Sequence, residues 1–252
     1  MKLLTLGRDL HRRKARERLG LFIAEGIRTV EELLRSSLTV RGALIGPQLG
    51  DAPRAQALVT QLRQRDIPIE EVGPREFESA AETESPQGIL AIGVVPAQTL
   101  DAIPAVEPLR LLILDALQDP GNVGTILRTA AAFGVNATFS LPGTVDLWNA
   151  KVVRSAMGAH FHHPCLNGTW DELDSFRRAR SVEVWASDVQ GEPLKGLEPP
   201  SRLALVVGNE GSGLSSLSRT RADRFVALPI ASTVESLNVA VAAGILLYEL
   251  RR

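Results

Sequence analysis

Short apolar runs alternate with helix-like segments along the second half of the chain, and this alternation most constrains the fold. The runs cover residues 111–114, 137–141, 182–186, 203–207 and 225–228, and helical patterns occupy 124–133, 150–157 and 234–250. Strands that read as continuous apolar runs are buried on both faces, as in parallel sheets connected by helices. The pattern predicts an α/β domain with a mostly parallel sheet and helices on both faces.

The first half of the chain reads as a smaller α/β domain. Helical periodicity predicts helices at 26–36 and 54–65, and apolar runs predict strands at 40–45, 67–72 and 88–95. The polar segment 80–88 between the last two strands is expected to be an exposed loop. Residues 96–108 contain three prolines and little periodicity, which indicates a linker. The expected domains are therefore residues 1–95 and 109–252.

Positive charge is concentrated at the start of the chain. Residues 1–28 contain eight Lys or Arg and three Asp or Glu, a net charge of +5, whereas the whole chain of 252 residues carries −1. This asymmetry is typical of a polyanion-binding end on a neutral body. A solvated, charged first helix would have the same composition, so both interpretations stay open.

Several other kinds of site are disfavoured by composition. Cys165 is the single cysteine, so no disulfide can form within the chain. His160, His162 and His163 lack further metal-ligand companions, and alternation along a strand would point the last two to opposite faces. The chain shows neither a secretory signal nor an apolar stretch of about 20 residues. We therefore expect no metal, no membrane span and a soluble cytoplasmic protein.

Three segments at the ends of predicted strands combine turns with polar residues. In the first, Asn122 is placed to cap a helix that carries Arg128 among apolar neighbours, which favours an orientation toward a cleft. The second, residues 203–215, runs from an apolar strand into a glycine-rich turn that suits close approach of the backbone to a ligand. In the third, Ser232 and Glu235 match a capping box, and Ser236 and Asn238 fall in the first helical turn.

These segments predict a ligand crevice, because ligands of open α/β sheets bind at the carboxyl ends of the strands. Taken singly, the second and third are explained equally well by turn formation or helix capping, and the Arg of the first by a surface position. The glycine pattern is neither a Rossmann fingerprint nor a P-loop, which disfavours a nucleotide-dependent oxidoreductase.

Taken in order, the three segments closely resemble the signature motifs of the SpoU, or TrmH, family of RNA ribose 2′-O-methyltransferases in the SPOUT superfamily. The motif Asn-x-Gly-x-x-x-Arg corresponds to residues 122–128, Gly-x-Glu-x-x-Gly-Leu to 208–214, and Pro-Ile with Ser-Leu-Asn-Val to 229–239. Ala240 stands where the family often has Ser. The match covers about residues 109–252, and residues 1–105 resemble the substrate-binding domain of rRNA-directed members.

The resemblance implies a deep trefoil knot in the C-terminal domain, S-adenosylmethionine as cofactor, and a homodimer. It also implies where the cofactor would bind. The implied contacts are Leu205, Val207, Gly208, Asn209, Gly213, Leu228, Ile230, Ser236, Leu237 and Asn238.

The resemblance further implies a catalytic centre made of Asn122, Arg128, Glu210, Ser236 and Asn238. The family's motif Arg is assigned as general base, yet Arg stays protonated in proteins. The other interpretation is that Arg128 binds the adjacent phosphate bidentately and aligns the ribose. Asn122 would orient Arg128 or the substrate, Glu210 would brace the second loop, and the other two would line the site.

The expected substrate is RNA, most simply a 23S-type rRNA. A tRNA methyltransferase and an inactive RNA-binding protein of the same fold are the alternatives. The retained motif residues count against an inactive protein. The candidate RNA-binding side chains are Arg8, Arg12, Arg13, Lys14, Arg28, Arg128, Lys151 and Arg154.

Overall fold

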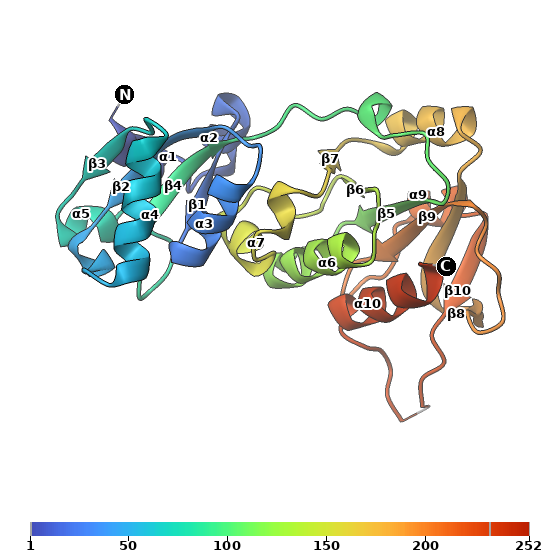
Figure 1. Cartoon of the computed structure of the whole chain (residues 1–252). Helices are drawn as coiled ribbons and strands as arrows, with labels where there is room; N and C mark the ends of the chain where they lie inside the picture. Colours follow the sequence, from blue (N-terminus) through green and yellow to red (C-terminus); the bar gives the residue numbers. More distant parts are fainter. Residues whose placement is uncertain (1, 232, 252) are drawn as a thin grey trace. The chain divides into compact units, whose positions relative to one another are not determined.

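The computed structural model describes residues 2–231 and 233–251, and the chain forms two compact units (Figure 1). Unit 1 comprises residues 1–97 and 148–162, and unit 2 comprises residues 98–147 and 163–252. The segment 148–162 therefore packs with the first part of the chain, although it lies between strands of unit 2 in the sequence.

Unit 1 is built on a four-stranded sheet of order β1-β4-β2-β3, in which β2 and β3 pair in parallel and the other pairs are antiparallel. The strands are β1 (Leu21–Glu25), β2 (Val40–Ile45), β3 (Ile69–Glu71) and β4 (Ile89–Val94). The helices and 3-10 turns are α1 (Leu3–Asp9), α2 (Arg13–Leu19), α3 (Ile27–Arg35), η1 (Pro47–Leu49), α4 (Pro53–Gln64), α5 (Pro74–Glu78), α7 (Ala150–Ser155) and η3 (Ala159–Phe161).

The predicted helices and strands of the first half are present, but the pattern missed β1 and the short helices α1, α2 and α5. β1 is short and obtains its hydrogen bonds from β4, which lies more than 60 residues away in the chain. Pairing over such a distance leaves little trace in local periodicity. Segment 80–88 contains neither helix nor strand, as expected, but it is not fully exposed, because Ala80 is completely buried.

Aromatic packing anchors segment 148–162 in unit 1. The ring of Phe22 lies 4.5 Å from that of Trp148 and 5.7 Å from that of Phe161, centroid to centroid. The ring of Trp148 also packs against that of His160 in a tilted arrangement, with the centroids 4.2 Å apart. Buried aromatic pairs are among the most stabilising apolar contacts, so they hold α7 against β1. His162 is the C-cap of the 3-10 turn η3, and His163 lies outside any strand, so the prediction that strand alternation separates these two side chains was wrong.

Unit 2 contains a six-stranded sheet of order β10-β8-β9-β5-β6-β7, in which every pair is parallel. The predicted parallel α/β domain is confirmed. The strands are β5 (Leu109–Asp115), β6 (Ala137–Ser140), β7 (Cys165–Asn167), β8 (Glu183–Pro193), β9 (Arg202–Gly208) and β10 (Arg224–Ala227). The helices are η2 (Leu100–Ala102), α6 (Pro120–Ala132), α8 (Trp170–Ala179), α9 (Ser216–Arg221) and α10 (Val239–Leu250).

Helices cover both faces of this sheet. Leu111 and Ile113 of β5 share one core with Trp170 and Phe176 of α8. Leu112, equally buried, points to the opposite face because side chains alternate along a strand. On that side α10 packs against α6 and β9 (Figure 1). Among the described residues, no helix is long and apolar enough to span a bilayer.

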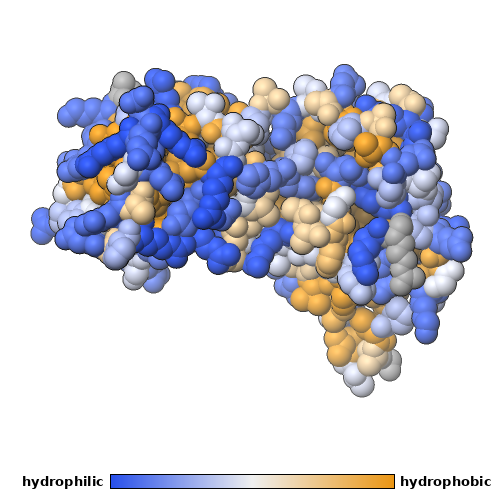
Figure 2. All heavy atoms as spheres, in the orientation of Figure 1, coloured by the Kyte–Doolittle hydropathy of each residue, from blue (hydrophilic) through white to orange (hydrophobic). Residues whose placement is uncertain are grey.

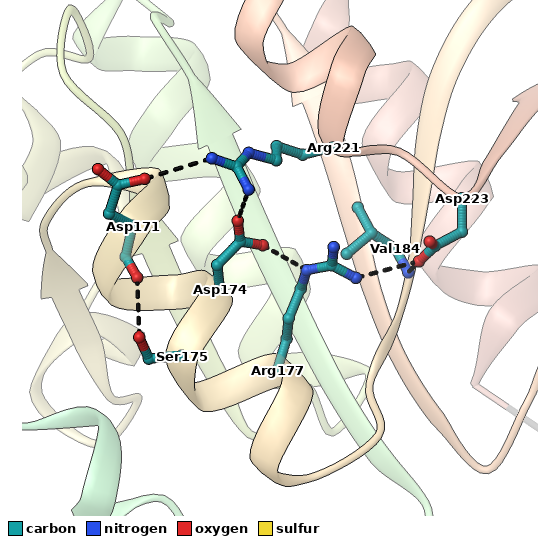
Figure 3. Close-up of polar contacts among 7 residues, drawn as sticks. All are labelled: Asp171, Asp174, Ser175, Arg177, Val184, Arg221 and Asp223. Carbon is teal, nitrogen blue, oxygen red and sulfur yellow. Dashed lines mark hydrogen bonds and ion pairs between the residues drawn. The ribbon is translucent and has the colours of Figure 1, made fainter.

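An ion-pair network joins α8 to the segment that enters β10 (Figure 3). The carboxylate of Asp174, nearly buried, pairs with both Arg177 and Arg221. Arg177 also lies 3.4 Å from Asp223, whose carboxylate accepts a hydrogen bond from the Val184 amide at 2.8 Å. Neither α8 nor α9 was predicted from the sequence. A capping box formed by Thr169 and Glu172 was the available signal for α8.

Candidate active site

The loops after β5 and β9 leave the sheet of unit 2 side by side. The register pairs Asp115 with Gly208, the last residues of these two strands. The buried carboxylate of Asp115 accepts a hydrogen bond from the Ser215 amide at 2.7 Å, and the side chain of Asn209 donates to the Ala116 carbonyl at 2.7 Å. These two contacts fasten the glycine-rich loop to the loop that precedes α6.

A chain of side-chain hydrogen bonds connects all three motif segments. Asn238 Nδ2 donates to Asn122 Oδ1 at 3.0 Å, and Asn122 Nδ2 donates to Glu210 Oε1 at 3.2 Å. We call these three residues the amide relay. The structure thus brings together Asn122, Glu210 and Asn238, which lie up to 116 residues apart in the sequence.

The orientation of each amide in the relay is fixed by its neighbours. The Ala240 and Val241 amides donate to Asn238 Oδ1 at 2.9 and 3.3 Å, so the nitrogen of Asn238 must face Asn122. At the other end Glu210 Oε1 is the acceptor, and Asn122 Oδ1 already accepts from Asn238, so the nitrogen of Asn122 lies on the Glu210 side. The relay therefore runs in one direction, from the start of α10 to the carboxylate.

Two helix starts differ from the sequence predictions. α6 begins at Pro120, and its N-cap is Asp119, whose Oδ1 accepts from the Asn122 amide at 2.7 Å; the prediction of Asn122 as the cap was wrong. α10 begins at Val239 with Asn238 as its N-cap, so the predicted start near residue 234 was also wrong. Asn is among the strongest N-cap residues, which explains the later start. Ser232, which was predicted to form a capping box with Glu235, lies outside the described residues.

The glycine-rich turn closes on itself. A Cβ at Gly208 would lie 2.6 Å from the backbone carbon of Gly213, and Gly213 adopts a positive φ of 69°. The backbones of Asn209 and Gly213 exchange hydrogen bonds at 2.9 and 3.0 Å. Glycine is required at position 208 because the backbone of Gly213 approaches it closely. From the sequence, the expected reason was close approach of the loop backbone to a ligand.

A cavity of about 120 Å³ lies beside the β10–α10 segment. Four of the candidate cofactor contacts line it, namely Leu228, Ile230, Ser236 and Leu237. Leu205 and Val207 are buried within the sheet, so only their backbone could meet a ligand. Gly208, Asn209, Gly213 and Asn238 are outside the lining of this cavity. One wall of the cavity is contributed by β8, through Ser187, Asp188 and Val189, and was not predicted from the sequence.

Arg128 projects from the exposed side of α6, the helix that carries Asn122. It directly precedes Thr129, which α10 approaches at Gly244, where an added Cβ would lie 3.6 Å from Thr129 Cγ2. Arg128 therefore lies on the helix that contributes Asn122 to the relay and that packs against α10. The lining of the cavity described above does not include Arg128.

The basic residues near the N-terminus are partly neutralised within unit 1. Arg12 pairs with Asp9, and Arg13 Nε lies 2.7 Å from Glu17. Arg8 donates to the hydroxyl of Ser79 at 2.7 Å, whereas Lys14 is exposed. The remaining candidates of this unit, Arg28, Lys151 and Arg154, lie on α3 and α7, with Lys151 and Arg28 exposed.

Two titratable groups of unit 2 belong to the core. His163 is buried and hydrogen-bonds through Nε2 to the Thr138 hydroxyl at 2.7 Å, and burial lowers its pKa to about 4. Complete burial raises the pKa of the Cys165 thiol. A thiol that resists ionisation is a poor nucleophile. Both groups are therefore structural.

Comparison with known proteins extends over the whole chain. Residues 110–248 match the model of the SpoU rRNA Methylase family, and residues 6–91 match that of the MRM3-like substrate binding domain. The 23S rRNA (guanosine(2553)-2′-O)-methyltransferase RlmP of Bacillus subtilis is 34% identical over 97% of this chain and 94% of its own length.

Solved structures agree with this match. The SpoU methyltransferase AviRb from Streptomyces viridochromogenes, in complex with AdoMet, superposes with a TM-score of 0.89 at 28% identity, covering 100% of this chain and 97% of that one. An AdoMet-bound rRNA methyltransferase from Sinorhizobium meliloti gives a TM-score of 0.86 at 27% identity, covering 99% and 94%.

Proposed function

The chain belongs to the SpoU rRNA methylase family, and we propose that it transfers a methyl group from S-adenosylmethionine to a ribose 2′-hydroxyl of RNA. The observation that carries this proposal is the amide relay. It joins one side chain from each of the three motifs at the carboxyl edge of the sheet, where α/β proteins bind their ligands.

The cavity beside the β10–α10 segment suits parts of the cofactor. Leu228, Ile230 and Leu237 provide apolar walls for an adenine ring or an aliphatic chain, and the hydroxyls of Ser187 and Ser236 can hydrogen-bond. The backbone of residues 205–213 would complete the site. Bound there, S-adenosylmethionine would supply a methyl group already activated by its sulfonium, so that positioning contributes much of the rate.

We assign Arg128 to positioning of the substrate. A guanidinium remains protonated and presents paired donors, so it can bind a phosphate bidentately and align the adjoining ribose. Its place on α6 links it through the helix to Asn122, while Glu210 braces the second loop and Ser236 lines the cavity. The relay holds the start of α10 in place and so keeps the third motif segment next to the first two.

We propose 23S rRNA as the substrate class and the cytoplasm as the place of action. The names of the relatives specify 23S rRNA, and the match to a substrate-binding domain in unit 1 favours rRNA over tRNA. Arg8, Arg12, Arg13, Lys14 and Lys151 would then contact the RNA backbone.

We further propose a homodimer and the trefoil knot typical of the superfamily. An apolar surface supports the dimer. Exposed large hydrophobic side chains run along α10 and the loop before it, which Figure 2 shows as hydrophobic spheres gathered over this part of unit 2. We call it the α10 stripe; it comprises Ile230, Val234, Leu237, Val241, Ile245 and Tyr248. A patch of this kind on a monomer usually marks an interface.

Transfer of a radiolabelled methyl group from S-adenosylmethionine tests the proposal. The purified chain is incubated with bulk rRNA, with bulk tRNA or with rRNA whose 2′-hydroxyls are already methylated. We expect incorporation into the first substrate alone, with alkali-resistant 2′-O-methyl dinucleotides as the product. Incorporation into tRNA alone would favour the alternative substrate. Cofactor binding without transfer to any RNA would indicate an inactive RNA-binding protein.

A further inference from the structure

A second cavity, of about 300 Å³, lies within unit 1 and is unrelated to the amide relay. It is formed where the end of β1, the first turn of α3, the loop before β4 and α7 meet. Its volume is at the lower end for small-molecule sites, which suits one unit of a polymer. Seven of its nine lining residues have charged or polar side chains; the lining is Glu25, Gly26, Arg28, Thr29, Thr83, Ser85, Gln87, Arg154 and Met157.

A buried carboxylate forms the floor of this cavity. Glu25 is 4% exposed and accepts hydrogen bonds from the Glu82 amide at 2.9 Å, the Thr83 amide at 3.3 Å and the Thr83 hydroxyl. Backbone and hydroxyl donors therefore satisfy much of its hydrogen-bonding capacity. The loop that carries Thr83 is fixed to β1 by the same contacts.

An arginine beside this carboxylate, Arg154, has a hydrogen-bond donor left unsatisfied by the described residues. Arg154 Nη1 lies 3.9 Å from Glu25 Oε2, which is close enough for ionic attraction but too far for a hydrogen bond. This nitrogen is buried and has no hydrogen-bond partner within the described part of the chain. A buried guanidinium donor without an acceptor costs stability, so a ligand oxygen there would be favourable.

The rest of the wall is arranged to favour an anion. Arg28 supplies a second guanidinium, so two positive charges face one negative charge in the cavity.

Gln87 Oε1 accepts from the Ile27 amide at 2.9 Å and thereby closes the first turn of α3. The backbone turns there at Gly26, with φ of 93°, and a Cβ at this position would lie 3.0 Å from the same oxygen. The polar loop 80–88 is therefore a wall of the cavity and is held in place.

We propose that this cavity binds one unpaired nucleotide of the substrate RNA, with its phosphodiester between Arg28 and Arg154. Paired guanidinium groups match the geometry of phosphate oxygens. Thr29, Thr83 and Ser85 offer hydroxyls to the ribose or base edge, and proteins recognise RNA sequence mostly at single-stranded positions that can enter such pockets. The inference rests on the proposed function, because it takes RNA as the substrate.

Fluorescence anisotropy with a fluorescein-labelled single-stranded RNA of twelve nucleotides tests the inference on the full chain. Affinity is measured over a range of KCl concentrations for the wild type, Arg28→Gln and Arg154→Gln. Arg41→Gln, an exposed arginine of β2 outside the cavity, is the matched control. We expect each cavity variant to bind about tenfold more weakly. We also expect its log–log salt slope to be smaller by about 0.7, the value for one phosphate contact on a single strand.

Three further measurements separate the possible failures. Arg154→Lys should retain the salt slope while losing affinity, because it keeps the charge without the paired donors. Salt slopes equal to that of the wild type in both Gln variants would overturn the inference. Calorimetry with inorganic phosphate would also overturn it if phosphate binding depended on both arginines while RNA affinity did not. Absence of methyl transfer by the wild type would instead refute the proposed function, because the salt slope does not depend on catalysis.

Discussion

Replacement of Asn238 separates its two roles, because its oxygen caps α10 and its nitrogen reaches Asn122. Loss of an N-cap costs about 1 kcal/mol. An exposed hydrogen bond between two amides contributes about 1 kcal/mol more. Asn238→Ala loses both, so we expect the free energy of unfolding to fall by about 2 kcal/mol.

Asn238→Asp retains an oxygen for the Ala240 and Val241 amides, and its charge is favourable at a helix N-terminus. It loses the donor and places a carboxylate oxygen against Asn122 Oδ1. Asn122 cannot reverse its amide without losing Glu210. We therefore expect Asn238→Asp to lose about 1 kcal/mol, roughly half the effect of the Ala variant.

Urea denaturation followed by tryptophan fluorescence measures these free energies, and methyl transfer is measured on the same samples. Glu235→Ala is the matched control: it removes the residue that the sequence had placed in a capping box, and it should leave stability unchanged because α10 begins later. We expect both Asn238 variants to lose methyl transfer. Equal destabilisation by Ala and Asp would refute the capping argument, and wild-type transfer by Asn238→Asp would refute the role of the relay.

Three other variants test separate parts of the structure. Arg128→Ala should abolish methyl transfer while calorimetry still detects S-adenosylmethionine binding; loss of cofactor binding would contradict a substrate-positioning role. His163 has a folded pKa of about 4 against 6.5 in the unfolded chain, so the unfolded state binds the proton first. The stability that neutral His163 provides is complete above pH 6.5 and is lost progressively as the pH falls toward 4, by up to about 3 kcal/mol; His163→Gln should flatten this part of the stability curve, and an unchanged curve would exclude the assignment. Arg110 donates to the Leu250 carbonyl at 2.8 Å and to the Pro200 carbonyl at 2.9 Å, so Arg110→Met should lower the free energy of unfolding by about 3 kcal/mol in urea, and a loss below about 1 kcal/mol would show that these carbonyls find other donors.

The sheet of unit 2 was predictable because its strands are buried on both faces. The central residues of β5 (111–114) and β9 (203–207) are all buried and aliphatic, and this leaves a continuous apolar signal in the sequence. The meeting of the three motif segments followed from the same rule, since parallel strands end at one edge. The family resemblance, which needed the order of the motifs as well as their residues, is confirmed by the comparisons.

Other features depend on contacts that local patterns do not encode. The association of α7 with β1 rests on Phe22 meeting Trp148 and Phe161, more than 120 residues along the chain. Helix starts were misplaced because several residues near each start could serve as caps, and tertiary contacts decide among them. Asn238, and not an earlier residue, is the N-cap of α10, and its side-chain nitrogen also donates to Asn122.

The β10–α10 segment leads to a last prediction, because one stretch of chain contributes to two proposed sites. Ile230 and Leu237 line the cavity proposed for the cofactor and also belong to the exposed α10 stripe. Binding at one site fixes side chains that the other site also uses, so the two sites should be coupled, and such coupling is reciprocal. We therefore expect S-adenosylmethionine to strengthen dimerisation measured by light scattering, and Ile245→Asp, on the stripe but outside the cavity lining, to weaken both dimerisation and cofactor affinity. A dimer unaffected by cofactor, or a monomeric Ile245→Asp that binds it with wild-type affinity, would show that the two sites are independent.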